Sequence, residues 1–197
     1  MKLVAITGGI GAGKSVVSQC LRALGYSVYD CDSRAKVLMD NDKSIIKAIG
    51  EQIDQRCVNL EAYSINRKLL SEIVFNDESA LGRLNNIVHA AVTEDLERWS
   101  RKMDTRGQRI GFVETAILYQ SNLDKVVDQV WDIKAPREIR VNRVMARNGM
   151  TAKEVCSRIR AQESYNPGRV HHDVITITND GRTPVLPSIE RMLRQIK

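Results

Sequence analysis

The segment that most constrains the fold of this chain is the glycine-rich run Gly8-Gly9-Ile10-Gly11-Ala12-Gly13-Lys14-Ser15. It fits the pattern G-x-x-x-x-G-K-[ST], whose glycines let successive backbone N–H groups turn inward around a phosphate. A strand-like apolar stretch precedes the run, and apolar residues at helical spacing follow it, at Val17, Cys20, Leu21 and Leu24. A strand, a phosphate-binding loop and a helix in this order predict a P-loop nucleotide-binding core.

The rest of the pattern predicts an α/β fold, because short apolar strands alternate with amphipathic helices. We expect a P-loop NTPase three-layer sandwich with a five-stranded parallel sheet, whose strands cover residues 2–7, 26–30, 109–114, 129–135 and 173–178. Between the second and third strands the apolar residues recur only at helical spacing. We therefore expect a single domain over 1–197, with a helical acceptor-binding insertion at about 33–105.

A second helical segment, at about 136–165, is predicted to form a lid over a nucleotide. Its first helix starts at Pro136 and ends before Gly149, and the next opens with the capping-box pattern of Thr151 to Glu154. Arg143 and Arg147 lie four residues apart, on one helical face. Two guanidinium groups so placed predict a clamp on a transferred phosphoryl group.

The charge and composition favour small anionic substrates over nucleic acid. The net charge is +6 and the pI is near 9.2, but no run of Lys and Arg is longer than two residues. Aromatic residues make up 5% of the chain, too few for a platform on which bases stack. We expect polyphosphate substrates and no nucleic acid.

Cysteine usage and the N-terminal sequence indicate the compartment. Cys20, Cys31, Cys57 and Cys156 stand far apart, which predicts reduced thiols and neither a zinc site nor disulfides. The chain begins directly with a strand-like stretch, without the pattern of a secretory signal, and no apolar run is long enough to span a membrane. We expect a cytoplasmic protein that acts as a monomer or weak homo-oligomer.

The P-loop itself assigns roles to its members. Backbone N–H groups are expected to hold the phosphates, while the Lys14 ammonium neutralises β- and γ-oxygens. No His, Cys or carboxylate cluster has the spacing of a metal site, so Mg²⁺ is expected on the Ser15 hydroxyl, ATP and water. The nucleotide-binding residues expected in this stretch are Gly9, Gly11, Ala12, Gly13, Lys14, Ser15 and Val16.

Two aspartates stand at the end of the second predicted strand, in Tyr29-Asp30-Cys31-Asp32. Ligands of open α/β sheets bind beyond the carboxyl ends of the strands, which is where these side chains fall. Asp32 is predicted to accept a proton from an attacking hydroxyl or to help hold the metal. One of the pair is expected to cap the helix that starts near Ser33.

The sequence lacks the signature motifs of other nucleotide hydrolases. No N-K-x-D base-reading motif is present, and the D-x-x-G match at 104–107 follows a helix. The third strand ends in Glu114 instead of a Walker B aspartate, and Glu114 either orients a metal-bound water or simply ends the strand. His89, in the long predicted helix, either contacts an acceptor phosphate or fills a polar groove.

Over nearly its full length the chain resembles the dephospho-CoA kinase family. The opening Thr7-Gly8-Gly9-Ile10-Gly11 is more specific than a generic P-loop, and the Asp30-Cys31-Asp32 segment is similar to the family's Asp-Ala-Asp. Further similar stretches are Leu84–His89, the lid arginines Arg143–Arg147, the Arg-x-x-x-Gln signature Arg158–Gln162, and Asn179–Gly181, which corresponds to a loop near adenine.

The resemblance implies transfer of the ATP γ-phosphoryl group to the ribose 3′-hydroxyl of dephospho-CoA. It implies that Lys14 and Ser15 handle ATP and Mg²⁺, that Asp32 acts on the hydroxyl and Arg147 on the transferred group. Nucleotide contacts are expected from Arg143 and Asn179, and acceptor contacts from Arg83 and His89 in the helical block.

Three positions depart from the family pattern: Val16 replaces a Thr, Ala90 replaces a Pro, and Gln120 stands where Glu is usual. None of them alters Lys14 or Asp32. The residues also leave other functions open, namely a small-molecule P-loop kinase of the nucleoside monophosphate or shikimate/gluconate type, and a nucleotide-binding regulatory module.

Overall fold

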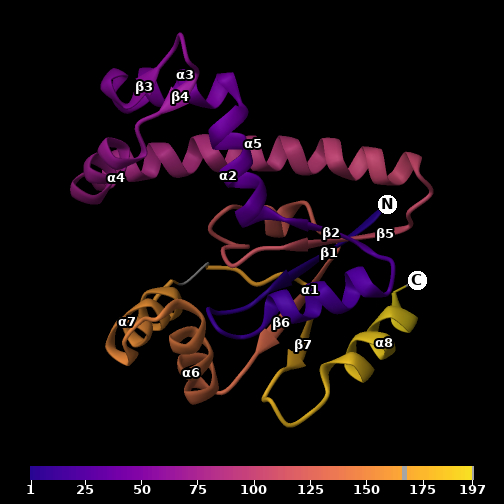
Figure 1. The fold of residues 1–197 in the computed structure, drawn as a ribbon. Coiled ribbons are helices and arrows are strands. Elements are labelled where there is room, and N and C mark those ends of the chain that lie inside the picture. The colour runs from indigo at the N-terminus through magenta and orange to yellow at the C-terminus, as the bar shows by residue number, and fades with distance from the viewer. Residues whose placement is uncertain (166–167, 197) are drawn as a thin grey trace. The chain divides into compact units, whose positions relative to one another are not determined.

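The structure is a computed structural model that describes residues 1–165 and 168–196. The chain divides into two compact units, and Figure 1 labels the elements of each. Unit 1 comprises Met1–Tyr29 and Met103–Lys197, and unit 2 comprises Asp30–Lys102. The two units are described in turn.

Unit 1 is built on the predicted parallel sheet, whose strand order is β2-β5-β1-β6-β7. The central strand β1 pairs in parallel with β5 and β6, with Ile6 opposite Glu114 and Trp131, and β6 pairs in parallel with β7. The strands are β1 (Lys2–Thr7), β2 (Ser27–Asp30), β5 (Ile110–Glu114), β6 (Gln129–Lys134) and β7 (Val174–Thr178). The α/β fold and the five-stranded sheet are confirmed.

Two helices of unit 1, α1 (Lys14–Ala23) and α8 (Val185–Gln195), place their apolar stripes against the sheet (Figure 1). Their buried members contact strand residues in one cluster, because each helix repeats apolar side chains on a single face. The cluster includes Val17, Leu21, Ile189 and Met192 from the helices and Ile6, Phe112, Trp131, Ile133 and Ile177 from the strands. This packing fixes the start of α1, and with it the end of the P-loop.

The predicted lid consists of α6 (Arg137–Asn148) and α7 (Ala152–Glu163), drawn in orange in Figure 1. Gly149 ends α6 in the left-handed conformation, and the capping box of α7 is present. The Thr151 N–H donates to Glu154 Oε2 at 2.8 Å, and the Glu154 N–H donates to Thr151 Oγ1 at 3.4 Å. The helices share a small apolar core of Val144, Val155 and Ile159.

Unit 2 is mostly helical, as expected. Its helical elements are α2 (Cys31–Asn41), α3 (Lys43–Gln52), the 3-10 turn η1 (Gln55–Cys57), α4 (Arg67–Asn76) and α5 (Glu78–Thr105). The last residues of α5 belong to unit 1. A bidentate ion pair joins α2 to α5, since Arg34 Nε and Nη2 lie 2.8 and 3.0 Å from the two carboxylate oxygens of Asp95. The pair is partly buried, which favours a fixed geometry.

The expectation that this stretch contains no strands is wrong. A short antiparallel hairpin, β3 (Val58–Asn59) and β4 (Ser64–Ile65), lies between η1 and α4, with Val58 opposite Ile65. The Asn59 side chain accepts from the backbone N–H groups of Glu61 and Ala62, which closes the turn. Strands of two residues are too short to show an alternating pattern, so sequence periodicity gives no sign of them.

The four cysteines are free thiols, two buried (Cys31, Cys57) and two partly exposed (Cys20, Cys156). Among the described residues, no helix is both long enough and apolar enough to cross a membrane.

The two phenylalanines of the chain offer a matched test of the core. Phe112 is fully buried and its ring centroid lies 5.2 Å from that of Trp131, whereas Phe75 is 88% exposed. Phe112→Ala is expected to lower the free energy of unfolding by about 3–5 kcal/mol, because it removes a large buried ring and leaves a cavity. Phe75→Ala is expected to change it by less than about 0.5 kcal/mol. Chemical denaturation followed by circular dichroism measures both, and equal losses would contradict the packing described.

Candidate active site

The P-loop packs so closely against its neighbours that two of its glycines cannot be replaced without strain. Gly8 has φ +140° and Gly13 has φ +98°, values that side chains rarely adopt. A Cβ on Gly8 would collide with the carbonyl oxygen of Ile133 on β6, and one on Gly13 with the side-chain amide of Asn179. The loop therefore follows the ends of β6 and β7 closely.

Lys14 is the first residue of α1, and its ammonium lies across the loop. Its Nζ donates to the carbonyl oxygen of Gly8 at 2.9 Å, so the positive charge lies beside the Gly8–Gly9 end of the loop. Ser15 and Val16 are exposed in the first turn of the helix. A lysine charge and the positive end of a helix together make an anion-binding site.

The backbone of Ile10, in the middle of the loop, is held by both lid helices. Its N–H donates to Gln162 Oε1 of α7 at 2.7 Å, and its carbonyl accepts from Arg140 Nε of α6 at 2.9 Å. Arg140 Nη1 lies 3.0 Å from Glu163 Oε1, and the Arg140 side chain is only 12% exposed. The Ile10 side chain packs against the cluster around Val144. The loop is thus joined to the lid helices by hydrogen bonds from side chains to its backbone and by apolar packing, while the Arg140–Glu163 ion pair joins the two lid helices to each other.

The following part of the loop is held by Asn179, which comes directly after β7. Its Nδ2 donates to the carbonyl oxygen of Ala12 at 2.9 Å. Arg143 in turn donates from Nη2 to Asn179 Oδ1 at 3.2 Å and from Nη1 to the Asn179 carbonyl at 3.1 Å. The structure thus brings Arg143 and Asn179 to the loop, although their contacts with a nucleotide stay predictions.

Arg147, predicted beside Arg143, lies away from the loop. It is exposed, and its Nε donates to Asn148 Oδ1 at 2.8 Å. The reason is the length of the helix: Arg147 lies one turn further along α6, close to its end at Gly149. Besides Arg143, the arginine of α6 that contacts the loop is Arg140, one turn nearer the start of the helix.

That residue, Arg140, was not predicted, although its spacing of three residues before Arg143 places both on one face of the helix. Its ion-pair partner Glu163 was not predicted either. Gln162 belongs to the Arg-x-x-x-Gln stretch, but the sequence does not tell that this glutamine binds a loop peptide more than 150 positions away.

Of the two aspartates at the end of β2, one caps the following helix, as expected. Asp30 is the N-cap of α2, because its Oδ1 accepts from the Ser33 N–H at 3.1 Å and its Oδ2 from the Ser33 hydroxyl at 2.8 Å. Asp32 is exposed in the first turn of the same helix. Since Asp30 supplies the cap, capping does not require Asp32.

Arg83 and His89 both lie on α5 of unit 2, but they are not on the same face. They are six residues apart, which separates them by roughly 120° around the helix axis. Arg83 donates from Nε to the Gln52 carbonyl at 2.6 Å and from Nη1 to Ser79 Oγ at 2.8 Å. Burial lowers the pKa of His89, so this side chain is neutral at pH 7. A neutral His89 can donate a hydrogen bond to a phosphate but adds no charge.

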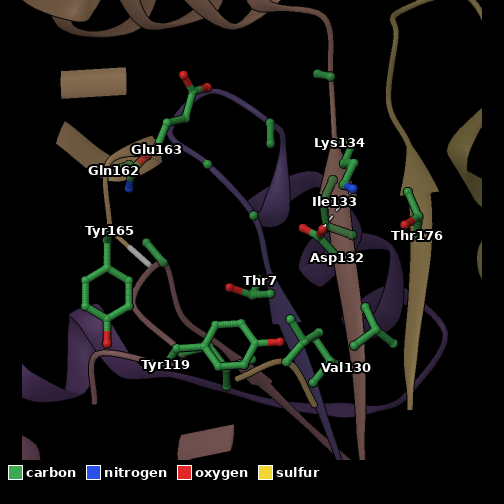
Figure 2. A pocket seen from close by; sticks show the side chains of 18 of the residues that line it. Thr7, Tyr119, Val130, Asp132, Ile133, Lys134, Gln162, Glu163, Tyr165 and Thr176 are labelled. Atoms are coloured by element: carbon green, nitrogen blue, oxygen red, sulfur yellow. Dashed lines mark ion pairs between the residues drawn. The ribbon is translucent and has the colours of Figure 1, made fainter. Parts of the chain in front are cut away.

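A cavity of about 610 Å³ lies next to the loop, within unit 1 (Figure 2). Its walls come from the start of the P-loop, from the residues after β5, from β6 and from the end of α7. Val170 also lines the cavity. The preceding residue, Arg169, forms an ion pair with Asp124, with its guanidinium nitrogens 2.6 and 2.9 Å from the two carboxylate oxygens. This pair lowers the pKa of the Asp124 carboxyl. A cavity of this size at the carboxyl end of a parallel sheet is typical of a small-molecule site.

A protein-family model described as dephospho-CoA kinase matches residues 2–184. A dephospho-CoA kinase of Dehalococcoides mccartyi is 33% identical over 193 residues, which cover 98% of this chain and 96% of that protein. A dephospho-CoA kinase of Geobacter sulfurreducens is 34% identical over 200 residues, which cover 100% of this chain and 97% of the relative.

A solved structure agrees with the fold. The crystal structure of a Thermus thermophilus protein matches with a TM-score of 0.73 and 29% sequence identity, over 99% of this chain and 95% of that chain.

The contact of Arg140 with Ile10 leads to a prediction about nucleotide affinity. Arg140→Lys keeps the charge, but a single ammonium cannot replace a guanidinium that binds both the Ile10 carbonyl and Glu163. A hydrogen bond from a charged donor contributes about 1.5–3 kcal/mol, so we expect the Kd for ATP to rise about tenfold. Calorimetric titration measures it. The matched control is Arg137→Lys, because Arg137 is an exposed arginine at the start of the same helix. If the wild type, Arg140→Lys and Arg137→Lys bind ATP equally well, the role given to Arg140 is contradicted.

The lowered pKa of His89 leads to a prediction about stability. An exposed histidine in the unfolded chain binds its proton near pH 6.5, before the folded protein does, so the unfolded state takes up more protons as the pH falls. Stability is therefore expected to decline as the pH falls through 6.5 toward the folded pKa of His89. Denaturation curves between pH 7.5 and pH 5 measure the decline. His89→Gln is expected to reduce it, and an unchanged decline in that variant would assign it to other groups.

Proposed function

Because the chain belongs to the dephospho-CoA kinase family, we propose that it transfers the γ-phosphoryl group of ATP to the ribose 3′-hydroxyl of dephospho-CoA and so forms coenzyme A. The protein is a kinase that uses ATP. The structural observation that carries the proposal is the P-loop. The loop leads into the N-terminus of α1 at Lys14, and the Lys14 ammonium reaches back to Gly8 at the beginning of the loop. Such a loop binds the phosphates of a nucleoside triphosphate.

In the proposed reaction, the loop N–H groups and Lys14 bind the β- and γ-phosphates. Phosphoryl transfer requires little covalent chemistry from the protein, so positioning and charge stabilisation account for most of the rate. The hydrogen bonds of Gln162 and Arg140 to the Ile10 backbone support this role. A loop that is already held loses less conformational entropy when the nucleotide binds.

Mg²⁺ fits the residues at the start of α1. The ion prefers hard oxygen ligands and usually keeps several waters, so one protein hydroxyl beside the phosphates suffices, and Ser15 supplies it. In the described part of the chain, no three His, Cys, Asp or Glu side chains gather as a metal site. Ser15 would hold the ion, which would supply positive charge to stabilise the phosphate oxygens.

Asp32 is the proposed group that accepts the proton of the attacking 3′-hydroxyl. Its support is that Asp30 already caps α2, so the exposed carboxylate of Asp32 is not needed as the cap. Arg83 and His89 of unit 2 are proposed acceptor contacts, which makes unit 2 the acceptor-binding insertion predicted for about 33–105.

The arginines of α6 are proposed to stabilise the transferred phosphoryl group. Arg143 has the better support, since its guanidinium already lies against Asn179 and the loop. Arg147 would have to leave Asn148 to take part, and the exposed hydrogen bond between them opposes this only weakly.

An ATP-consumption assay with Mg²⁺ tests the function. Dephospho-CoA is expected to stimulate turnover, while AMP, shikimate and adenosine are not. Asp32→Asn is expected to lower kcat with dephospho-CoA about 10²–10⁴-fold, because the hydroxyl loses its proton acceptor.

Asp30→Asn is the matched control, since asparagine caps helices as well as aspartate does and the neighbouring charge is removed. Stimulation by another acceptor instead would show a different kinase, and no stimulation by any acceptor would favour a regulatory nucleotide-binding module. Equal activity of Asp32→Asn and wild type would remove Asp32 from the mechanism.

A further inference from the structure

The roles given to the P-loop and lid residues leave most of the 610 Å³ cavity of unit 1 without a ligand. The cavity begins at Thr7, Gly8 and Gly9, where β1 passes into the loop, and extends along β6 to Val130. Figure 2 shows Tyr165 and Asp132 at opposite sides of the view, with Thr7 between them. The question is which part of which substrate such a space accepts.

The position of the cavity along the loop indicates the acceptor side. The Lys14 ammonium, which binds β- and γ-oxygens in a P-loop, lies against the Gly8 carbonyl, and Gly8 lines the cavity. Arg143 and Asn179 contact the loop further along, at Ala12. The cavity therefore adjoins the end of the loop at which the γ-phosphate lies, which is where an acceptor must approach.

The charges around the cavity are paired within its own walls. Lys134 Nζ lies 3.5 Å from Asp132 Oδ2, and Arg140 Nη1 lies 3.0 Å from Glu163 Oε1. A space lined by two such pairs has no excess of positive charge for a phosphate. It suits an uncharged group that can form hydrogen bonds.

Two tyrosines in the cavity wall indicate that the group bound there is planar. Tyr119, after β5, is held by its hydroxyl, which accepts from the His171 N–H at 3.3 Å, and Tyr165 follows the end of α7. Their rings line the cavity (Figure 2), together with apolar residues such as Leu118. Aromatic rings stack on nucleobases, whose two faces are apolar and whose edges are polar.

We propose that this cavity binds the adenine base of the acceptor, with Tyr119 as its stacking platform and the Asp132 carboxylate accepting from the exocyclic amino group. The inference rests on the proposed function. In dephospho-CoA the base is attached to the same ribose that carries the 3′-hydroxyl, so a hydroxyl at the γ-phosphate places the base about one sugar ring away. The pantetheine arm leaves the ribose through the 5′-diphosphate and is further from the reaction.

The test is steady-state kinetics with both substrates varied. Tyr119→Ala and Tyr165→Ala are each expected to raise the KM for dephospho-CoA, about tenfold for Tyr119, while the KM for ATP stays the same. Tyr119→Phe keeps the ring but removes the hydroxyl that accepts from His171, so it is expected to raise this KM much less than Tyr119→Ala does. Tyr165 is 42% exposed, so its variant retains the fold even if Tyr119→Ala does not.

The role of Asp132 is tested with an acceptor that carries hypoxanthine in place of adenine. The wild type is expected to prefer the adenine acceptor about tenfold, since hypoxanthine lacks the amino group that a carboxylate accepts from. Asp132→Asn is expected to lose most of this preference, because an amide can both donate and accept.

The outcomes separate this inference from the proposed function. If dephospho-CoA fails to stimulate the wild type, the proposed function is wrong. If it stimulates but both tyrosine variants keep the wild-type acceptor KM, the inference is wrong and the function stands. A rise in the KM for ATP alone would show that the cavity binds the adenine of ATP. Competition by free pantetheine that is weakened in Tyr119→Ala would show that the cavity binds the pantetheine arm, and would also overturn the inference.

Discussion

The structure of the nucleotide site depends on the way the backbone of one residue, Ile10, is fixed. A glycine-rich loop has many accessible backbone conformations, and ordering it costs free energy that nucleotide binding would otherwise have to supply. Here Gln162 binds the peptide N–H and Arg140 the carbonyl, while the side chain enters the apolar cluster of the lid helices. The lid helices therefore act on the loop before any contact with a phosphate, and a change at their ends alters nucleotide affinity through the loop.

What the sequence predicts well is local. The strand, the P-loop and the start of α1 are encoded in consecutive residues, so Lys14 and Ser15 are recognised without any knowledge of packing. The same holds for the capping box at Thr151 and for a cap at Asp30 or Asp32, although only the structure shows that Asp30 is the cap. In each case a short-range hydrogen bond determines the conformation, and the residues that make it lie within one helical turn.

What the sequence does not predict are contacts that depend on the orientation of one element against another. A helix presents several arginines at its surface, and spacing alone cannot tell which of them faces a loop, so the contact of Arg140 with the loop was missed. The β3–β4 hairpin was missed because strands of two residues have no periodicity. These failures have one cause: helical spacing defines a face, but tertiary packing decides which neighbour that face meets.

The distribution of charge divides the site in unit 1 into two kinds of space. On the loop, Lys14 and the start of α1 present positive charge that is suited to phosphates, and Arg143 adds to it. In the cavity, Asp132 and Glu163 cancel the nearest cations, so a phosphate gains nothing by entering it. A substrate with a charged part and an uncharged aromatic part is therefore oriented by both spaces, since a reversed arrangement would place the charge beside cations that already have carboxylate partners. Phosphoryl transfer needs this kind of orientation, because a small displacement of the attacking oxygen costs much of the rate.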